Sequence, residues 1–261
     1  MKREHNTARD LDKKQKAVII SVVVLLGLGL GFGAAHLVSG YIAYWDIVSG
    51  PFLLSLRVTF VAAVIAGTTG VASGYVLAKC RFPGRDLLET VGSLPIILPP
   101  TVAGYYLLEV LSPGTPPGGF LTRVTGHVFV YNASGCIIAA AVAAYPFCMK
   151  AARTAIEGVD PLLEQAARVM GLPNWRVALQ VTIPLARRGI AAGLTIGSAR
   201  ALGEYGATLM VGGDIDGKTR TLSLAVLDSF TTPERDTILL ILVLMAIIAM
   251  TGVGLLGRSR A

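Results

Sequence analysis

The side chains that could carry chemistry in this chain are few, and their spacing does not match a catalytic group. The three histidines are scattered, and no serine or cysteine has a base close to it in sequence. The three cysteines, Cys80, Cys136 and Cys148, lack metal-ligand spacing and are typical of small apolar residues in membrane helices. We therefore expect no catalytic residue, no metal and no cofactor in this chain.

Two local patterns resemble binding motifs of other protein classes. Residues 212–219 (GGDIDGKT) match the phosphate-binding loop pattern, but that loop needs a preceding strand and a nucleotide-binding domain, and little chain follows. Residues 163–177 resemble a DNA-reading helix-turn-helix, but the second helix has few base-reading side chains. We expect both matches to be accidental, and we expect no nucleic acid partner.

Arg200 and Glu204 are the most conspicuous ionisable pair, because both lie in a long apolar stretch. They are four residues apart and hence neighbours on a helix surface. Ionisable groups inside a membrane are costly and indicate a transport path, although a structural ion pair, with each other or with Arg57, is the simpler interpretation. With nearby hydroxyl groups they form a candidate translocation path: Thr195, Ser198, Arg200, Glu204 and Thr208.

The composition indicates an integral membrane protein. Of 261 residues, 53% are hydrophobic and only 15% are charged. Apolar stretches predict six transmembrane helices, at residues 17–38, 52–78, 88–111, 128–149, 189–211 and 237–256. The net charge of +7 comes from Lys and Arg that gather in 1–16, 79–85, 150–188 and 258–260, which predicts that both termini lie in the cytoplasm.

Two of the predicted spans carry special backbone signals. The third contains Pro95, Pro99 and Pro100, so it cannot be a regular helix throughout. In the fifth, small residues recur every four positions and lie along one face, where another helix can approach closely: Gly189, Gly193, Gly197 and Ala201.

A compact helical elbow is predicted between the fourth and fifth spans, at residues 160–184. Asp160 can cap a helix that starts at Pro161, and Gly171 can end that helix in a left-handed conformation. Asn174 can cap a second short turn, and Pro184 is expected to stop it.

The elbow resembles the cytoplasmic signature of ABC importer permeases, which is Glu-Ala-Ala, three residues, Gly, nine residues and Ile-x-Leu-Pro. Residues 165–184 keep every spacing, with Gln165 where the family usually has Glu. In that family the elbow is a coupling helix that docks on a separate ATPase subunit. The resemblance implies this role for Leu162, Leu163, Gln165, Ala166, Ala167, Val169, Met170 and Gly171.

Three further stretches, 94–105 (LPIILPPTVAGY), 200–210 (RALGEYGATLM) and 217–222 (GKTRTL), resemble the molybdate branch of oxyanion permeases. The resemblance implies an all-α integral membrane protein with the type I ABC importer permease fold, six transmembrane helices and a cytoplasmic coupling elbow. Its parts would be a basic cytoplasmic segment (1–16), an additional first helix (17–38) and the permease domain (45–257).

As a transport subunit rather than an enzyme, the chain would work as a homodimer in the lipid of a prokaryotic cytoplasmic (inner) membrane. The implied partners are an ABC ATPase, which would carry ATP and Mg, and an extracytoplasmic oxyanion-binding protein. Sulfate or tungstate transport stays open as an alternative. A channel or secondary transporter without an ATPase is another, although no second copy of the proline-rich span supports paired interrupted repeats.

Overall fold

The computed structural model describes residues 48–229, together with Leu239, Val243 and Ile247. All described residues belong to one compact unit of the chain, Ile47–Ala261. The predicted segments 1–16 and 17–38 lie outside the described residues. So does the last predicted span, 237–256, apart from those three positions.

Regular structure within 48–229 is helical throughout, with no strand in that range. Two of its helices are long and apolar enough to cross a membrane, Val48–Lys79 and α5 (Ala133–Glu157). A third span results if the bent pair α2 (Arg85–Ile97) and α3 (Pro100–Leu111) counts as one. The helices predicted at 52–78 and 128–149 are thus present with shifted ends. α5 starts late because the Asn132 side chain accepts a hydrogen bond from the Ala133 N–H group.

The proline-rich span is broken as predicted. The axes of α2 and α3 differ by 115°, and the break falls at Leu98 and Pro99, between the two helices. Pro95 is accommodated inside α2, whereas Pro99 and Pro100 end one helix and start the next. The short helix α4 (Pro116–Thr125), capped by the Thr115 hydroxyl, follows and was not predicted.

The predicted elbow contains α6 (Pro161–Val169) and α7 (Asn174–Val177). The Asp160 carboxylate accepts a hydrogen bond from the Leu162 N–H group at 2.9 Å, and Gly171 has a φ of +88°, as the sequence predicts. Two other predictions were wrong. Asn174 lies inside α7 and does not cap it, because its side chain accepts a hydrogen bond from Arg168 instead.

Pro184 does not stop the helical segment either. A π-helical turn, η1 (Ala178–Thr182), leads directly into α8 (Ile183–Leu202), with Pro184 in the first turn of α8. The Ile183 N–H group bonds to the Ala178 carbonyl, five residues back. This change of hydrogen-bond register places the missing N–H group of Pro184 at the join between two helix types, where the chain tolerates it.

The fifth span is not one helix over 189–211. Helix α8 ends at Leu202, the chain turns at Gly203, Glu204 and Tyr205, and a second helix follows, α9 (Gly206–Gly212). The next helix is α10 (Leu222–Ser229). Thr208 therefore belongs to a different helix from Thr195 and Ser198. Sequence periodicity missed this break because its cause is contact with α3, described below.

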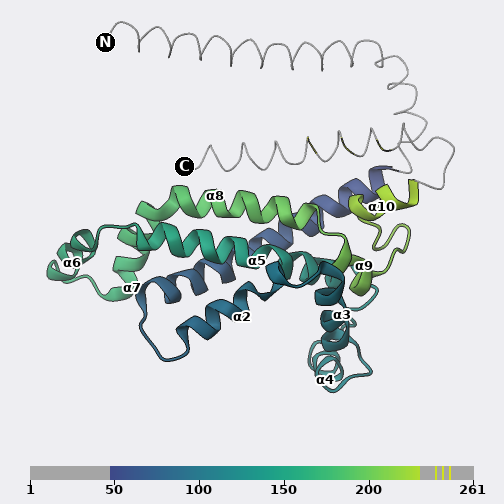
Figure 1. Cartoon of the computed structure of the whole chain (residues 1–261), viewed down its shortest axis with the longest axis horizontal. Helices are drawn as coiled ribbons and strands as arrows, with labels where there is room; N and C mark the ends of the chain where they lie inside the picture. Colours follow the sequence, from purple (N-terminus) through teal and green to yellow (C-terminus); the bar gives the residue numbers. More distant parts are fainter. Residues whose placement is uncertain (1–47, 230–238, 240–242, 244–246, 248–261) are drawn as a thin grey trace, which may run out of the picture. The chain divides into compact units, whose positions relative to one another are not determined.

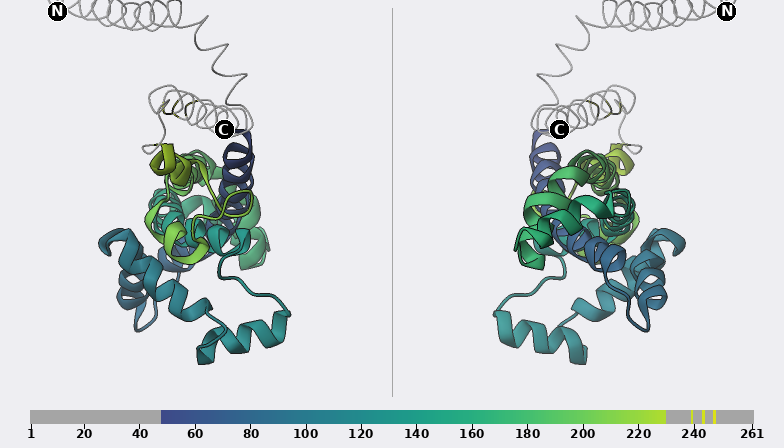
Figure 2. Two further views of the ribbon diagram at one scale, coloured as in Figure 1. Left: turned by 90° about the vertical axis from the view of Figure 1, so that its right-hand side faces the viewer. Right: turned by 90° about the vertical axis from the view of Figure 1, so that its left-hand side faces the viewer.

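Helices α5 and α8 run side by side, with α6 and α7 near one end and α3 and α9 near the other (Figure 1). The end-on views in Figure 2 show α5 in teal beside α8 in green. Gly189, Gly193 and Gly197 of α8 face Ala155, Ala151 and Cys148 of α5, so the two helices are antiparallel and the predicted stripe is their interface. The first described helix packs on the same α5 through Gly70 and Gly74.

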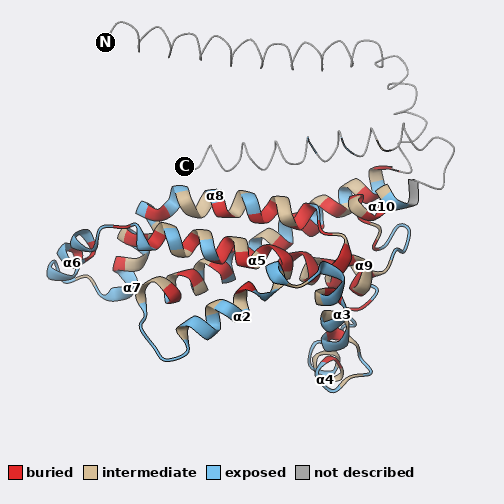
Figure 3. Ribbon diagram, in the orientation of Figure 1, coloured by how far each residue is buried: buried red, intermediate tan, exposed pale blue. Residues whose placement is uncertain are grey.

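Small side chains fill this core, and Figure 3 shows buried positions along the length of α5. The core joins the first described helix, α5 and α8 through Val58, Ala62, Ala66, Cys136, Ala140, Ala141, Ala144, Cys148 and Ala201. Close approach of backbones, rather than bulky side chains, holds the helices together, as expected where lipid removes the hydrophobic drive between helices.

Candidate functional site

A pocket lies where the two helix breaks meet. A Cβ atom on Gly206 of α9 would come within 2.9 Å of Pro100 Cβ and 3.0 Å of the Thr101 nitrogen atom, at the start of α3. Because only glycine permits this approach, the broken ends of two helices are brought together. The pocket is small and is lined by Pro95, Pro100, Ala103, Leu107, Ala139, Val142, Ala143, Arg200, Glu204 and Ala207.

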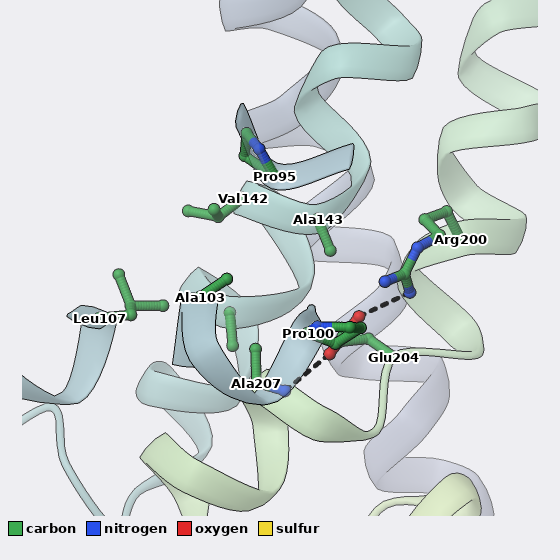
Figure 4. Close-up of a pocket in the computed structure, with 10 residues that line it drawn as sticks. Pro95, Pro100, Ala103, Leu107, Val142, Ala143, Arg200, Glu204 and Ala207 are labelled. Atoms are coloured by element: carbon green, nitrogen blue, oxygen red, sulfur yellow. Dashed lines mark hydrogen bonds and ion pairs between the residues drawn. The ribbon is translucent and has the colours of Figure 1, made fainter. Parts of the chain in front are cut away.

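Arg200 and Glu204 provide the charged part of the lining (Figure 4). Arg200 Nη1 lies 2.5 Å from Glu204 Oε2, and Glu204 Oε1 accepts a hydrogen bond from the Ala207 N–H group at 2.7 Å. Glu204 is only 2% exposed. Glu204 Oε2 contacts the Arg200 guanidinium as an ion pair but accepts no well-formed hydrogen bond. The predicted internal pairing of Glu204 is confirmed, and its partner is Arg200.

This arrangement neutralises both charges at the helix break. Burying an unpaired carboxylate would be strongly unfavourable, and pairing with Arg200 offsets part of that cost. The Ala207 N–H group is one of the unpaired donors at the start of α9, so Glu204 also satisfies a helix end. The same residue therefore holds the break in place and cancels the positive charge of the Arg200 guanidinium beside the pocket.

The predicted hydroxyl groups are not assembled at this pocket. The Thr195 and Ser198 hydroxyls donate to the Ala191 and Leu194 carbonyls, one turn earlier in α8, at 3.0 and 2.7 Å. Thr208 is buried in α9 and is not among the lining residues. Of the five candidate path residues, the structure brings Arg200 and Glu204 together and leaves the three hydroxyl groups elsewhere.

The phosphate-loop pattern at 212–219 is not a phosphate site. Helix α9 precedes it instead of a strand. Thr219 is fully buried, and its hydroxyl donates to the Gly213 carbonyl and accepts from the Ile215 N–H group. Asp214 pairs with Arg220 at 2.8 Å. The hydroxyl group that would hold magnesium is used to fold the loop.

The predicted elbow presents an exposed apolar surface. Gln165, Ala166 and Gly171 are exposed. The four apolar candidates beside them are each exposed by 49% or more: Leu162, Leu163, Val169 and Met170. Ala167 differs, because it is 3% exposed and faces the rest of the protein. Figure 3 shows α6 mostly pale blue, with few buried positions. A cluster of exposed apolar side chains indicates a contact surface for another molecule.

Sequence reasoning missed a buried acidic residue in this elbow. Glu164 was not among the candidate residues, yet it is 4% exposed and contacts Lys79 and Thr182. The available signal was its spacing of three residues from Ala167, which places both on one face of α6. Nothing in the sequence indicated Lys79 or Thr182 as partners.

Comparison with known proteins decides the family. Residues 68–259 match the family model of the binding-protein-dependent transport system inner membrane component. This chain belongs to that family. It is an inner membrane, multi-pass permease of a binding-protein-dependent transport system.

The permease is 40% identical over 185 residues to the molybdenum transport system permease protein ModB of Escherichia coli strain K12, covering 71% of this chain and 81% of that protein. It is 30% identical over 203 residues to the sulfate transport system permease protein CysT of the same strain, covering 75% and 73%.

Solved structures share the fold. A bacterial ABC transporter involved in the import of the acidic polysaccharide alginate has a TM-score of 0.68 at 15% identity, covering 85% of this chain and 83% of that chain. The MetNI methionine ABC transporter, in inward-facing conformations, has a TM-score of 0.61 at 19% identity, covering 84% and 98%. The described helices therefore have the fold of ABC importer permeases.

Proposed function

We propose that this chain is the permease subunit of an ATP-driven importer of molybdate. The observation that carries the proposal is the 40% identity to a molybdenum permease over 71% of the chain, against 30% to a sulfate permease over a similar span. A tetrahedral dianion cannot cross hydrocarbon without compensation of its charge, so import requires a protein path.

The elbow is the proposed contact with the ATPase. Its exposed apolar residues, led by Val169 at 89% and Met170 at 74%, support a docking role because water disfavours such a surface. ATP and Mg would bind to the ATPase and not to this chain. Closure of the ATPase would push on the elbow, and the transmembrane helices would switch between inward-facing and outward-facing states.

The proposed topology has six transmembrane helices, with residues 17–38 as the first and both termini in the cytoplasm. The gathering of Lys and Arg in 1–16, 79–85, 150–188 and 258–260 supports this orientation. The working unit is proposed to be a homodimer, so that two elbows meet two ATPase subunits.

The proposed path passes the Arg200–Glu204 pair. A free guanidinium would hold a dianion tightly and slow its release, whereas a free carboxylate would repel it. The paired state observed here avoids both effects. Thr195, Ser198 and Thr208 stay candidates for the path, as small hydroxylated side chains on the two helices that flank the break.

ATP-dependent uptake of labelled molybdate into vesicles tests the proposal. The vesicles contain this chain, its ATPase and its binding protein, with tungstate and sulfate as competitors. We expect uptake that tungstate blocks and sulfate hardly affects. Uptake of sulfate instead would show that the proposed substrate is wrong, while the proposed importer architecture would stand. Transport that ignores both ATP and disruption of 166–171 would overturn the importer assignment.

A further inference from the structure

Glu164 is a buried carboxylate on a helix that is otherwise exposed. The described residues of α6 that are buried are Glu164 and Ala167. A single alanine buries too little apolar surface to hold a nine-residue helix against the protein. The position of α6 must therefore depend on the contacts of the Glu164 side chain.

Those contacts join three separate elements. Glu164 Oε1 lies 2.8 Å from Lys79 Nζ, at the last residue of the first described helix. The Thr182 hydroxyl donates to the same oxygen atom at 2.7 Å. Arg168 Nη2, one turn along α6, lies 3.8 Å from Oε2. One carboxylate thus connects α6, the end of the helix Val48–Lys79 and the π-helical turn η1.

Thr182 links the Glu164 carboxylate directly to the start of α8. It is fully buried at the end of η1, and the next residue starts α8 without an intervening loop. Arg200, beside the pocket, lies eighteen residues after Thr182 along the continuous helical segment formed by η1 and α8, a distance of about 27 Å at 1.5 Å per residue. A π-helical turn at such a place is commonly associated with function.

We propose that the Lys79–Glu164–Thr182 contact makes the elbow, the first described helix and α8 move as one body. Glu164 is then a positioning residue for the transport cycle, because it transmits displacement of the elbow to the helix that carries Arg200. The inference rests on the proposed role of the elbow as the ATPase contact. It separates docking, through exposed apolar side chains, from transmission, through a buried charge.

The first test measures rigidity and needs no substrate. The full chain, with its three cysteines replaced, carries spin labels at the exposed positions Gln165 on α6 and Ile196 on α8, in lipid nanodiscs. We expect one narrow distance distribution in the parent chain and a broad one in Glu164→Gln and Thr182→Val. The control Glu157→Gln, which removes an exposed carboxylate paired with Arg85 and Arg153, should stay narrow. Narrow distributions in both test variants would overturn the proposal.

The second test measures coupling in the complete transporter. Glu164→Gln should retain the ATPase during purification and continue to hydrolyse ATP, while substrate moved per ATP falls by about tenfold. The exchange Lys79→Glu with Glu164→Lys should recover part of that loss. Loss of the bound ATPase, or unchanged transport per ATP, would contradict the proposal. If the parent complex moves no molybdate, the proposed substrate fails while the distance measurement still decides the role of Glu164.

Discussion

Gly104 of α3 and Ala207 of α9 are so close that a Cβ atom on Gly104 would lie 2.6 Å from the Ala207 Cα atom. The two helices that follow the breaks are therefore in backbone contact beside the Arg200–Glu204 pair. Both breaks are needed for this contact, because α3 begins directly after the break that ends α2, and α9 begins directly after the break that ends α8. The pocket exists because two interruptions meet.

We expect Gly104→Ala to destabilise the folded state by about 1–3 kcal/mol, because the added methyl group forces the two helices apart. Thermal unfolding in detergent measures the change. Gly50→Ala is the matched control, since a Cβ atom there meets nothing within 4 Å, and helical alanine should be neutral or stabilising. Equal stability of the two variants would contradict the close packing of α3 on α9.

The α5–α8 interface makes a compensating prediction. A Cβ atom on Gly193 would overlap the Ala151 Cβ atom, so Gly193→Ala should destabilise the protein by about 1–3 kcal/mol. Adding Ala151→Gly should restore part of that loss. A double-mutant cycle on unfolding free energies measures the coupling, and purely additive effects would show that the two positions do not touch.

Glu204→Gln should retain a hydrogen bond to the Ala207 N–H group but leave the Arg200 guanidinium unpaired. We expect a loss of about 1–3 kcal/mol of stability and slower uptake, because the uncompensated cation holds a dianion. Combining it with Arg200→Gln should recover part of the uptake. Faster transport by Glu204→Gln with unchanged stability would show that the pair does not serve a structural purpose.

The elbow contact predicts a specific pH dependence. Burial alone would raise the pKa of Glu164, but hydrogen bonds from Lys79 and Thr182 outweigh it and hold the pKa below the ordinary value of 4.5. A carboxylate with a lowered pKa stabilises the folded state above its unfolded pKa, and this contribution disappears as pH falls through the folded pKa.

The free energy of unfolding of the parent chain should therefore exceed that of Glu164→Gln by about 1–3 kcal/mol at pH 7. The difference should be constant at higher pH and shrink only below pH 4.5. Chemical unfolding in detergent at several pH values measures it, with Glu157→Gln as the control for acid effects elsewhere. A difference that grows on acidification would contradict the charged state of Glu164.

Val169→Glu should abolish retention of the ATPase while leaving the stability of the permease unchanged, since that side chain is 89% exposed. Affinity purification of the complex measures retention. Phe120→Glu on α4, toward the other end of the α5–α8 pair in Figure 1 and 67% exposed, is the control and should retain the ATPase. Retention by Val169→Glu would assign the ATPase contact to another surface.

Sequence alone determined the features that depend on neighbouring residues or on a repeating period. Composition identified a membrane protein, three prolines predicted the break in the third span, and the stripe from Gly189 to Ala201 predicted a close helix contact. Asp160 and Gly171 marked the ends of α6 correctly. Each of these signals comes from composition, from a repeating period or from residues adjacent to the feature, so no knowledge of the fold was needed.

Tertiary structure alone decided the rest, because the causes come from distant parts of the chain. The turn at 203–205 forms where Pro100 of α3 packs on Gly206 and Glu204 bonds to the start of α9. Pro184 continues a helix because η1 shifts its hydrogen-bond register. The buried carboxylate of Glu164 pairs with Lys79, at the end of another helix, and only folding brings those two charges within 2.8 Å.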